Sequence, residues 1–554
     1  MVGSAYRVGF AALLGVCVSL GASAPAFAKS SNVWRITKTH WSSADEKGFG
    51  DFVQAIGESI CSSSESCLRN PANPYRHLDP RGFDIDADCA KWPYMLRAYY
   101  AWHNGLPFSI VNAVSGKGGD IRYSKTANRA VSRHDFIDHG KGINGPRAVR
   151  ETINSVYSAT YRTDARESKG VLSDFYSPAL QPGSIRPGTI VYDINGHVGI
   201  IYKVDADGRA YYMDAHPDFS VSRSVYGAQF GQSPARLGGG FKNWRPFVLK
   251  GARRNAAGDY IGGKMVFAEN DAIPDFSLVQ YTGTEPNPKD DVKKAVFDYN
   301  GVPLGFYEYV RVAVSGGKMT FNPIYELHMT MKTLCNDLKD RAQYVDQAIA
   351  ERLQNKAHPP RLPDNIYGSS NVEWETYSTP SRDARIKAAF QQFYRDMKDM
   401  IGMWVNRDKR VVYDGQFLKR DLAEAYAQES KACTITYLSS DKRPVPITFD
   451  DMAHRLYRLS FDPYDCIERR WGASGKEADS CPDGRSKTRW YEAEQRLRNQ
   501  SDRTYDVSMN FSVSDLEDHK PGTGIDDPPP VDVKSLIDGI GPQVSFEGMT
   551  PVGH

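Results

Sequence analysis

The sequence has no excess of either charge, no internal repeat, and no long apolar stretch after residue 28. Its 69 lysine and arginine residues nearly balance 67 aspartate and glutamate residues, so charge gives no reason to expect a nucleic-acid partner. Without a second apolar stretch, we expect no membrane span after the first residues. His134 and His139 each lie beside an aspartate, but the two-histidine helical motif of zinc hydrolases is missing. We therefore expect neither a metal site nor a cofactor.

The start of the chain is typical of an exported protein. Arg7 precedes small and apolar residues that end in Ala26-Phe27-Ala28, a small-x-small pattern typical of a cleavage site. We predict a signal peptide over residues 1–28 and an exported protein, periplasmic or secreted. The alternatives are an uncleaved anchor, and a lipoprotein through Cys17, which Val16 disfavours as the residue just before a lipidated cysteine.

Cysteine is scarce, and its number becomes odd once the signal peptide is removed. Of the eight cysteines, seven remain after Cys17 is lost. In an oxidising compartment we expect most of them to pair. The predicted disulfide bonds, assigned by proximity and then by what is left, are Cys61–Cys67, Cys466–Cys481 and Cys335–Cys433. Cys89 then remains as a free thiol, either a nucleophile or an inert buried residue.

The surroundings of Cys89 favour the nucleophile. Cys89 follows Asp88 at the predicted start of an apolar helix, and much later His197 heads a predicted strand whose neighbour ends at Asp214. A thiol nucleophile needs a base, and the base needs an orienting group. The order cysteine, histidine, carboxylate therefore predicts a Cys89–His197–Asp214 triad. His216 is the alternative third residue.

The predicted position of Cys89 also sets an expectation for its charge. Unpaired N–H groups at a helix N-terminus favour an anion, Asp88 is a good N-cap candidate, and Lys91 adds positive potential. We therefore expect a lowered pKa for the Cys89 thiol. His197 would act as the base, with Asp214 fixing its tautomer.

These motifs resemble those of papain-like cysteine peptidases, and most closely the NlpC/P60 and CHAP cell-wall enzymes. Residues 88–90 (Asp-Cys-Ala) and 105–107 (Gly-Leu-Pro) are similar to the start and the exit of the cysteine-bearing helix in that family. Residues 186–191 (Arg-Pro-Gly-Thr-Ile-Val) resemble its strand before the histidine, and 196–200 (Gly-His-Val-Gly-Ile) are the closest match. The resemblance covers roughly residues 72–220.

The resemblance implies a fold and an activity. The fold would be α+β, with a papain-like N-terminal domain whose cysteine-bearing helix packs on an antiparallel sheet bearing the histidine and the aspartate. The activity would be hydrolysis of peptide amide bonds, in peptidoglycan or another peptide substrate, with Tyr75 and the Cys89 N–H stabilising the oxyanion. Two alternatives stay open. One is a transglutaminase-like acyl transferase, which Gly199 disfavours, and the other is an inactive papain-like scaffold that binds a cell-envelope partner.

The chain divides into regions of different character. The predicted regions are a signal peptide (1–28), a catalytic domain (29–255) with an insertion at about 110–180, a mixed and then mainly helical region (256–514), and a flexible acidic, proline-rich tail (515–554). Apolar residues at helical spacing over 327–353 and 386–404 predict two long helices. We expect the helical region to fold as its own unit and to serve positioning, recognition or binding of a protein partner.

Overall fold

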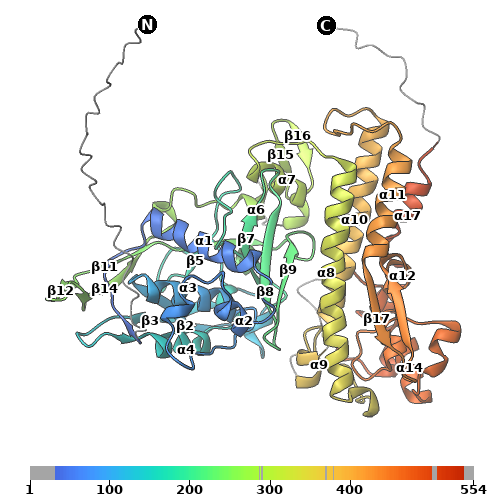
Figure 1. Ribbon diagram of the computed structural model, residues 1–554, viewed down its shortest axis with the longest axis horizontal. Coiled ribbons are helices and arrows are strands. Elements are labelled where there is room, and N and C mark those ends of the chain that lie inside the picture. Colours follow the sequence, from blue (N-terminus) through green and yellow to red (C-terminus); the bar gives the residue numbers. More distant parts are fainter. Residues whose placement is uncertain are drawn as a thin grey trace, which may run out of the picture.

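The structure is a computed structural model that describes residues 32–285, 287, 291–368, 371–377, 380–501 and 508–541. The predicted signal peptide lies outside these residues. Within them, no helix has both the length and the apolar character needed to cross a bilayer. The described chain mixes helices and strands, in agreement with the α+β prediction, and its sheet-bearing half lies beside a helical half (Figure 1).

A six-stranded antiparallel sheet organises the first half, in the order β5-β10-β6-β7-β8-β9. Its strands are β5 (Phe175–Tyr176), β6 (Ile190–Asp193), β7 (His197–Val204), β8 (Ala210–Ala215), β9 (Val221–Val225) and β10 (Gly240–Trp244). Gly196 closes the turn between β6 and β7 with φ 86°, a conformation that favours glycine. The register pairs Asp193 with His197, so this turn places the histidine at the very start of its strand.

One face of the sheet is covered by α1 (Ser43–Glu58) and α3 (Lys91–His103). Every residue of α3 from Trp92 to Trp102 is buried, because α4 (Gly145–Ser155) covers its remaining side. Near these helices lie α2 (Ser64–Arg69), α5 (Ser158–Tyr161), the hairpin of β2 (Phe108–Ser115) and β3 (Arg129–Phe136), and the pair β1 (Val33–Trp34) and β4 (Ile143–Asn144). This layer holds α3, and with it the start of α3, against the sheet.

The other face of the sheet is covered by residues that lie beyond the predicted domain limit at 255. Val191, Ile201 and Phe241 of the sheet share a core with Tyr309 and Val310 of α7. The elements of this face are α6 (Val279–Thr282), β15 (Phe297–Tyr299), β16 (Val302–Leu304) and α7 (Phe306–Val314). The strands β11 (Phe247–Lys250), β13 (Tyr260–Ile261) and β14 (Lys264–Phe267) pack instead with the core that includes α1 and α3, and β12 (Arg253–Arg254) pairs with β13. Because β11 pairs with β14, a boundary at 255 would divide a hairpin. The sheet-bearing unit therefore extends to about residue 314.

The second half has a helical core of its own, built on α8 (Pro323–Ala350) and α10 (Pro380–Val405). Both predicted apolar stripes are buried, as Leu334 and Leu338 in α8 and Phe390 and Met397 in α10 show. The remaining elements up to residue 499 are α9 (Val372–Tyr377), α11 (Leu418–Ala432), β17 (Thr434–Leu438), β18 (Pro444–Thr448), α12 (Phe449–His454), α13 (Ile467–Arg470), α14 (Arg485–Ala493) and α15 (Gln495–Asn499).

All three predicted disulfide bonds are present. Cys61–Cys67 joins the segment before α2 to α2 itself. Cys335–Cys433 joins α8 to the end of α11, and Cys466–Cys481 closes a short loop. Among the described cysteines, Cys89 alone is free, as the count predicts.

The predicted flexible tail is wrong for residues 515–541. This stretch includes the end of α16 (Val513–Glu517) and all of α17 (Val533–Asp538). Helix α17 packs on α10 and α11. Val533 and Ile537 are buried in the helical core. The prediction is based on the acidic and proline-rich composition of the segment and does not consider these few apolar residues, whose burial is enough to anchor it. Residues 542–554 of the predicted tail lie outside the described part.

The two halves meet along α8, which runs beside β9 at the edge of the sheet (Figure 1). At one end of this contact, Arg209 and Arg311 both bind Glu326 of α8, at 2.6 and 2.7 Å. At the other end, Gln347 donates to Asp218 at 2.6 Å. The helical region thus has a core of its own and is also fixed against the sheet that carries His197 and Asp214; that it folds as its own unit stays a prediction.

Candidate active site

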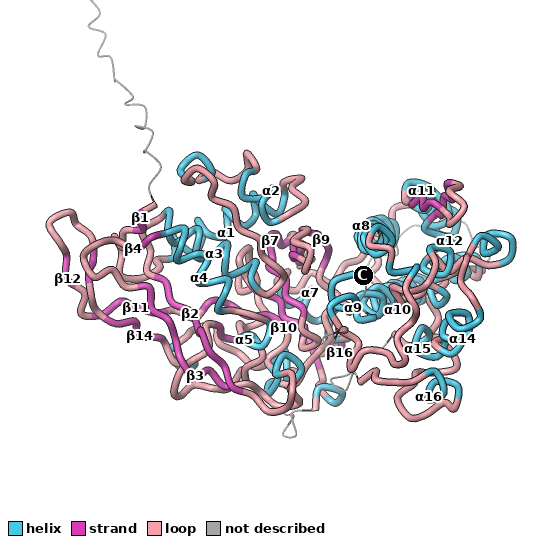
Figure 2. The backbone as a smooth tube through the Cα atoms, turned by 90° about the horizontal axis from the view of Figure 1, so that it is seen from below, coloured by secondary structure: helices cyan, strands magenta, loops and turns pink. Residues whose placement is uncertain are grey.

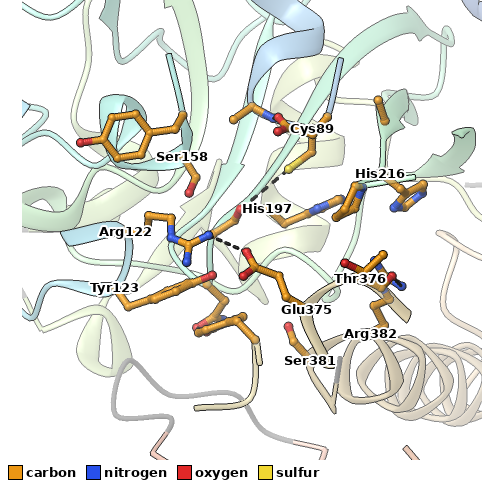
Figure 3. Close-up of a pocket in the computed structure, with 18 of the residues that line it drawn as sticks. Cys89, Arg122, Tyr123, Ser158, His197, His216, Glu375, Thr376, Ser381 and Arg382 are labelled. Carbon is orange, nitrogen blue, oxygen red and sulfur yellow. Dashed lines mark hydrogen bonds and ion pairs between the residues drawn. The ribbon is translucent and has the colours of Figure 1, made fainter. Parts of the chain in front are cut away.

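Cys89 lies just before the first turn of α3. Asp88 caps this turn, because its Oδ1 accepts hydrogen bonds from the N–H groups of Ala90 and Lys91, both at 3.2 Å. The Asp88 carboxylate also pairs with Lys91 Nζ at 2.7 Å. The Cys89 sulfur faces the β6–β7 turn and lies 3.9 Å from the carbonyl oxygen of Gly196, next to His197 (Figure 3).

The predicted histidine and carboxylate are paired. His197 Nε2 lies 2.5 Å from Asp214 Oδ2, and Asp214 Oδ1 accepts from the Ser222 hydroxyl at 2.6 Å. Since Asp214 engages Nε2, Nδ1 is the ring nitrogen of His197 that remains for a proton on the sulfur. His216 Nε2 lies 3.8 Å from Asp214 Oδ2 and 2.9 Å from Ser222 Oγ. Asp214 is therefore the direct partner of His197, and His216 contacts the Ser222 hydroxyl that donates to Asp214.

The thiol is not in the electrostatic setting that its position predicts. Burial raises the pKa of the Cys89 thiol to about 12, and the charges of Asp88 and Asp214 act in the same direction. A hydrogen bond with the Val198 backbone and the charge of Arg385 oppose the rise without cancelling it. The prediction of a lowered pKa is therefore wrong for this arrangement, because burial and two nearby carboxylates disfavour the anion.

The histidine is also held in its neutral form. Burial lowers the pKa of His197, and Arg385 lowers it further, although Asp214 opposes both effects. Burial works against the charge of Asp214, yet His216 and His197 keep its pKa well below the usual range. The pair of Cys89 and His197 therefore rests as a neutral thiol and a neutral imidazole beside an ionised carboxylate.

The structure does not bring Tyr75 to Cys89. The Tyr75 ring stacks on His103 with 5.3 Å between ring centroids, and its hydroxyl donates to Asn104 at 3.4 Å. Both partners lie at the C-terminal end of α3. Because α3 is 13 residues long, this end is about 20 Å from the end near Cys89. An oxyanion role for Tyr75 is thus excluded in this arrangement.

Cys89 and His197 line a pocket of about 270 Å³. The predicted insertion provides one wall with Arg122, Tyr123, Tyr157 and Ser158. The opposite side comes from the helical half: Tyr367, Val372, Glu375, Thr376, Ser381, Arg382 and Arg385. We call these last seven residues the roof. Figure 3 shows Glu375, Thr376, Ser381 and Arg382 across the pocket from Cys89.

The roof is fastened to the first half at the wall that carries Arg122 and Tyr123. Arg122 Nη1 lies 2.6 Å from Glu375 Oε1 of α9, while Arg122 also binds Asp120. Tyr367 stacks on Tyr123 with 4.0 Å between ring centroids, and its hydroxyl donates to Asn195 Oδ1. Figure 2 shows α9 between the sheet and the rest of the helical half. Sequence analysis missed the whole roof, because no local pattern links these residues to Cys89.

The pocket is lined by three arginines and two carboxylates. Arg382 and Arg385 belong to the roof, while Arg122 on the opposite wall is already paired with Glu375 and Asp120. Among the described residues, the groups close enough to hold a metal ion lie elsewhere in the chain and include no pocket residue. The chemistry available in the pocket is therefore that of a thiol, an imidazole and a carboxylate.

No family model, no curated protein and no solved structure matches this chain. Any function must therefore be argued from the contents of the pocket. Those contents are one free thiol, one neutral histidine held by an ionised carboxylate, and an arginine-rich lining.

Proposed function

We propose that the protein is an exported cysteine amidase or peptidase that hydrolyses peptide amide bonds. The observation that carries this proposal is the pairing of His197 Nε2 with Asp214 at 2.5 Å, in the pocket that also holds the free thiol of Cys89. A carboxylate that engages one ring nitrogen fixes the tautomer, so the other nitrogen can take a proton from a nucleophile.

The neutral resting pair determines how the reaction would start. As the Cys89 sulfur attacks the amide carbonyl, its proton passes to Nδ1 of His197, and Asp214 stabilises the imidazolium that forms. The imidazolium then protonates the leaving amine, and a thioester remains on Cys89. Water, deprotonated by His197, hydrolyses the thioester and restores the thiol. The Cys89 N–H is the candidate donor to the oxyanion, since the N–H groups of Ala90 and Lys91 already bind Asp88.

The pocket lining supports a substrate with a carboxylate near the scissile amide. Arginines bind carboxylates through paired N–H groups, and Arg382 and Arg385 of the roof line this pocket, whereas Arg122 is already paired with Glu375 and Asp120. The stem peptides of peptidoglycan carry free carboxylates and are outside the cytoplasm, where an exported enzyme would meet them. A pocket of about 270 Å³ lies near the lower end of the range for small-molecule sites, so it would admit a short segment of such a peptide.

The test is digestion of purified peptidoglycan sacculi and of soluble stem peptides, with products identified by mass spectrometry. We expect new amine and carboxyl termini at one amide bond, no products from Cys89→Ala, and far slower product formation by His197→Ala. An added primary amine separates hydrolysis from acyl transfer, because a transferase would attach that amine to the acyl group. Products that form equally with Cys89→Ala would rule out the proposal.

A second candidate is an inactive scaffold that binds a cell-envelope partner. It is favoured by the raised pKa of Cys89 and by the roof, which together describe a thiol that is both protonated and covered. Sedimentation with sacculi distinguishes the two. Binding that Cys89→Ala leaves unchanged, without any cleavage by the unaltered protein, would favour the scaffold.

A further inference from the structure

We propose that His358, Asp462 and Glu494 form a binding site for a divalent transition-metal ion such as Zn²⁺ in the helical half. His358 follows the turn Leu353–Asn355, Asp462 precedes α13, and Glu494 lies between α14 and α15. One donor atom from each residue lies within 4.8 Å of the others. The site is separate from the Cys89 pocket, whose lining includes none of the three.

The three side chains are fully buried and poorly compensated. Asp462 and Glu494 are 0% exposed, and the His358 side chain is 1% exposed. Within the described part of the chain, four of their atoms lack a hydrogen-bond partner: His358 Nε2, Asp462 Oδ2 and both carboxylate oxygens of Glu494. Burying a carboxylate without a partner is costly, so a buried group of this kind usually faces a cation.

The nearest arginine does not supply that cation fully. Arg498 Nη1 lies 3.8 Å from Glu494 Oε2, beyond hydrogen-bond distance. The same nitrogen donates instead to the carbonyl oxygen of Tyr491 at 2.7 Å. Glu494 therefore keeps both carboxylate oxygens available as ligands.

The tautomer of His358 is the one that binds metal. Its Nδ1 lies 2.5 Å from the carbonyl oxygen of Pro359, which can only accept, so Nδ1 must carry a proton. In the neutral ring, Nε2 then presents a lone pair, as the ligating nitrogen of a metal-bound histidine does. This nitrogen lies 2.9 Å from Asp462 Oδ2, close enough for one ion to contact both atoms. Without an ion, the same distance suits an imidazolium that donates to Asp462, and the protonation state of His358 therefore separates the two arrangements.

The donor set indicates the class of ion. An imidazole nitrogen favours zinc, iron, nickel or copper over magnesium and calcium, and carboxylates complete such sites. If Glu494 binds through both oxygens, the three residues supply four donor atoms, which is the number that structural zinc requires. We therefore expect a structural ion, enclosed by protein.

A second group at metal-binding spacing, Cys466, Glu468 and Cys481, lacks these properties. Its two cysteines form a disulfide bond. Glu468 accepts hydrogen bonds from the Ser440 N–H and hydroxyl and from the Ser480 hydroxyl, at 2.6 to 2.8 Å. The contrast shows that a buried carboxylate in this half is satisfied where no ion is needed.

The proposed ion would also support the roof of the Cys89 pocket. The His358 ring stacks on Trp490 with 3.9 Å between ring centroids, in a small core that includes Trp374 of α9. Tyr464, two residues after Asp462, donates to Glu373 of α9 at 2.5 Å. Binding at the three ligands would join the segments on which α9 rests.

The test uses the full chain after signal removal, desalted and analysed for metals by mass spectrometry. We expect about one equivalent of divalent transition metal per chain, and a melting temperature that falls with a strong chelator and recovers with Zn²⁺. Co²⁺ bound in place of the native ion should give visible absorption bands. His358→Gln and Glu494→Gln should abolish these bands or weaken Co²⁺ binding by at least roughly 10-fold to 100-fold.

The matched control is His328→Gln. His328 lies on α8, away from the proposed site, and its Nδ1 pairs with Glu429 of α11 at 2.8 Å. It should retain the bands and the response to Zn²⁺. If a ligand variant fails to fold, the unaltered protein still decides the question. A chain that holds no metal, with a melting temperature insensitive to chelator and Zn²⁺, would overturn the proposal. So would Co²⁺ bands that survive His358→Gln, or an imidazolium signal from His358 near neutral pH in the metal-treated protein.

Discussion

Removing the contact between Glu375 and Arg122 should make Cys89 more reactive. This ion pair, at 2.6 Å, fastens α9 of the roof to the wall of the pocket. A reagent must reach Cys89 through a pocket that α9 and the start of α10 cover. Cys89 is only partly exposed in this arrangement, so a state in which the roof has moved should be alkylated faster. We expect Glu375→Gln to make that state more frequent while preserving the size of the side chain.

The magnitude follows from the exposure of the pair. The side chains of Arg122 and Glu375 are 26% and 34% exposed, so solvent screens much of their attraction. Pairs of this kind contribute at most about 1 kcal/mol, which corresponds to an increase of about fivefold in the population of the open state at 25 °C. Arg122 keeps its contact with Asp120 at 2.8 Å, so the wall itself should stay in place.

The assay is the rate of iodoacetamide alkylation of Cys89 near neutral pH, followed by peptide mapping without reduction. The matched control is Glu517→Gln, which breaks an ion pair of equal length, 2.6 Å, between α14 and α16. We expect a rate increase of about fivefold or less for Glu375→Gln, and none for the control. High salt should reduce the difference, because it screens the ion pair in the unaltered protein. An unchanged or slower rate for Glu375→Gln, with its melting temperature preserved, would refute the gating role of α9.

Three further predictions concern the base, pH and the long-range disulfide. His197→Ala should slow amide hydrolysis by roughly 100-fold or more, because the neutral thiol loses its proton acceptor; substrate binding measured with Cys89→Ala and with the double variant should be equal. Burial raises the pKa of Asp337 to about 7, above its value in the unfolded chain, so the folded state holds an extra proton between about pH 4 and 7 and loses stability as pH rises through that range. Asp337→Asn should therefore increase the free energy of unfolding at pH 8 relative to the unaltered protein, by about 1 to 2 kcal/mol after allowance for partial exposure, and urea titrations in which the variant gains no more at pH 8 than at pH 5 would mean that the carboxylate is ionised throughout. Replacing Cys335 and Cys433, which lie 98 residues apart, by serine should destabilise the helical half by up to about 4 to 5 kcal/mol, and urea unfolding that is unchanged would mean that the unfolded chain is already compact there.

The parts of the site that the sequence predicts are those that depend on neighbours in the chain. Asp88 caps α3, Gly196 forms the turn before His197, and the pairing of β7 with β8 brings Asp214 to the histidine. The cysteine count also leaves Cys89 free. Each of these inferences uses a turn, a cap or a pairing rule that acts over a few residues, or a count that needs no geometry.

The roof could not be predicted in this way. Arg122 and Glu375 are 253 residues apart, and no periodicity or spacing relates them. The lack of a local pattern also explains why the predicted pKa of the Cys89 thiol is wrong. Its pKa depends on how deeply the folded chain buries Cys89 and on the charge of Asp214, which the local helix start does not determine. The predicted oxyanion role of Tyr75 is wrong for a related reason, since packing against His103 places Tyr75 at the far end of α3.

The roof connects access to the site with the reactivity of the thiol. The largest cause of the raised pKa of Cys89 is burial, and burial is also what keeps a substrate out. If α9 and the start of α10 move away, Cys89 gains water, and the cost of forming the thiolate falls. The loss of Arg385, which favours the thiolate, opposes this change, but it ranks below burial and below the charges of Asp88 and Asp214. Opening the roof should therefore both admit a peptide and lower the pKa of its nucleophile. If the protein is the amidase proposed above, the covered site would stay inert toward other carbonyl compounds until a substrate displaces the roof.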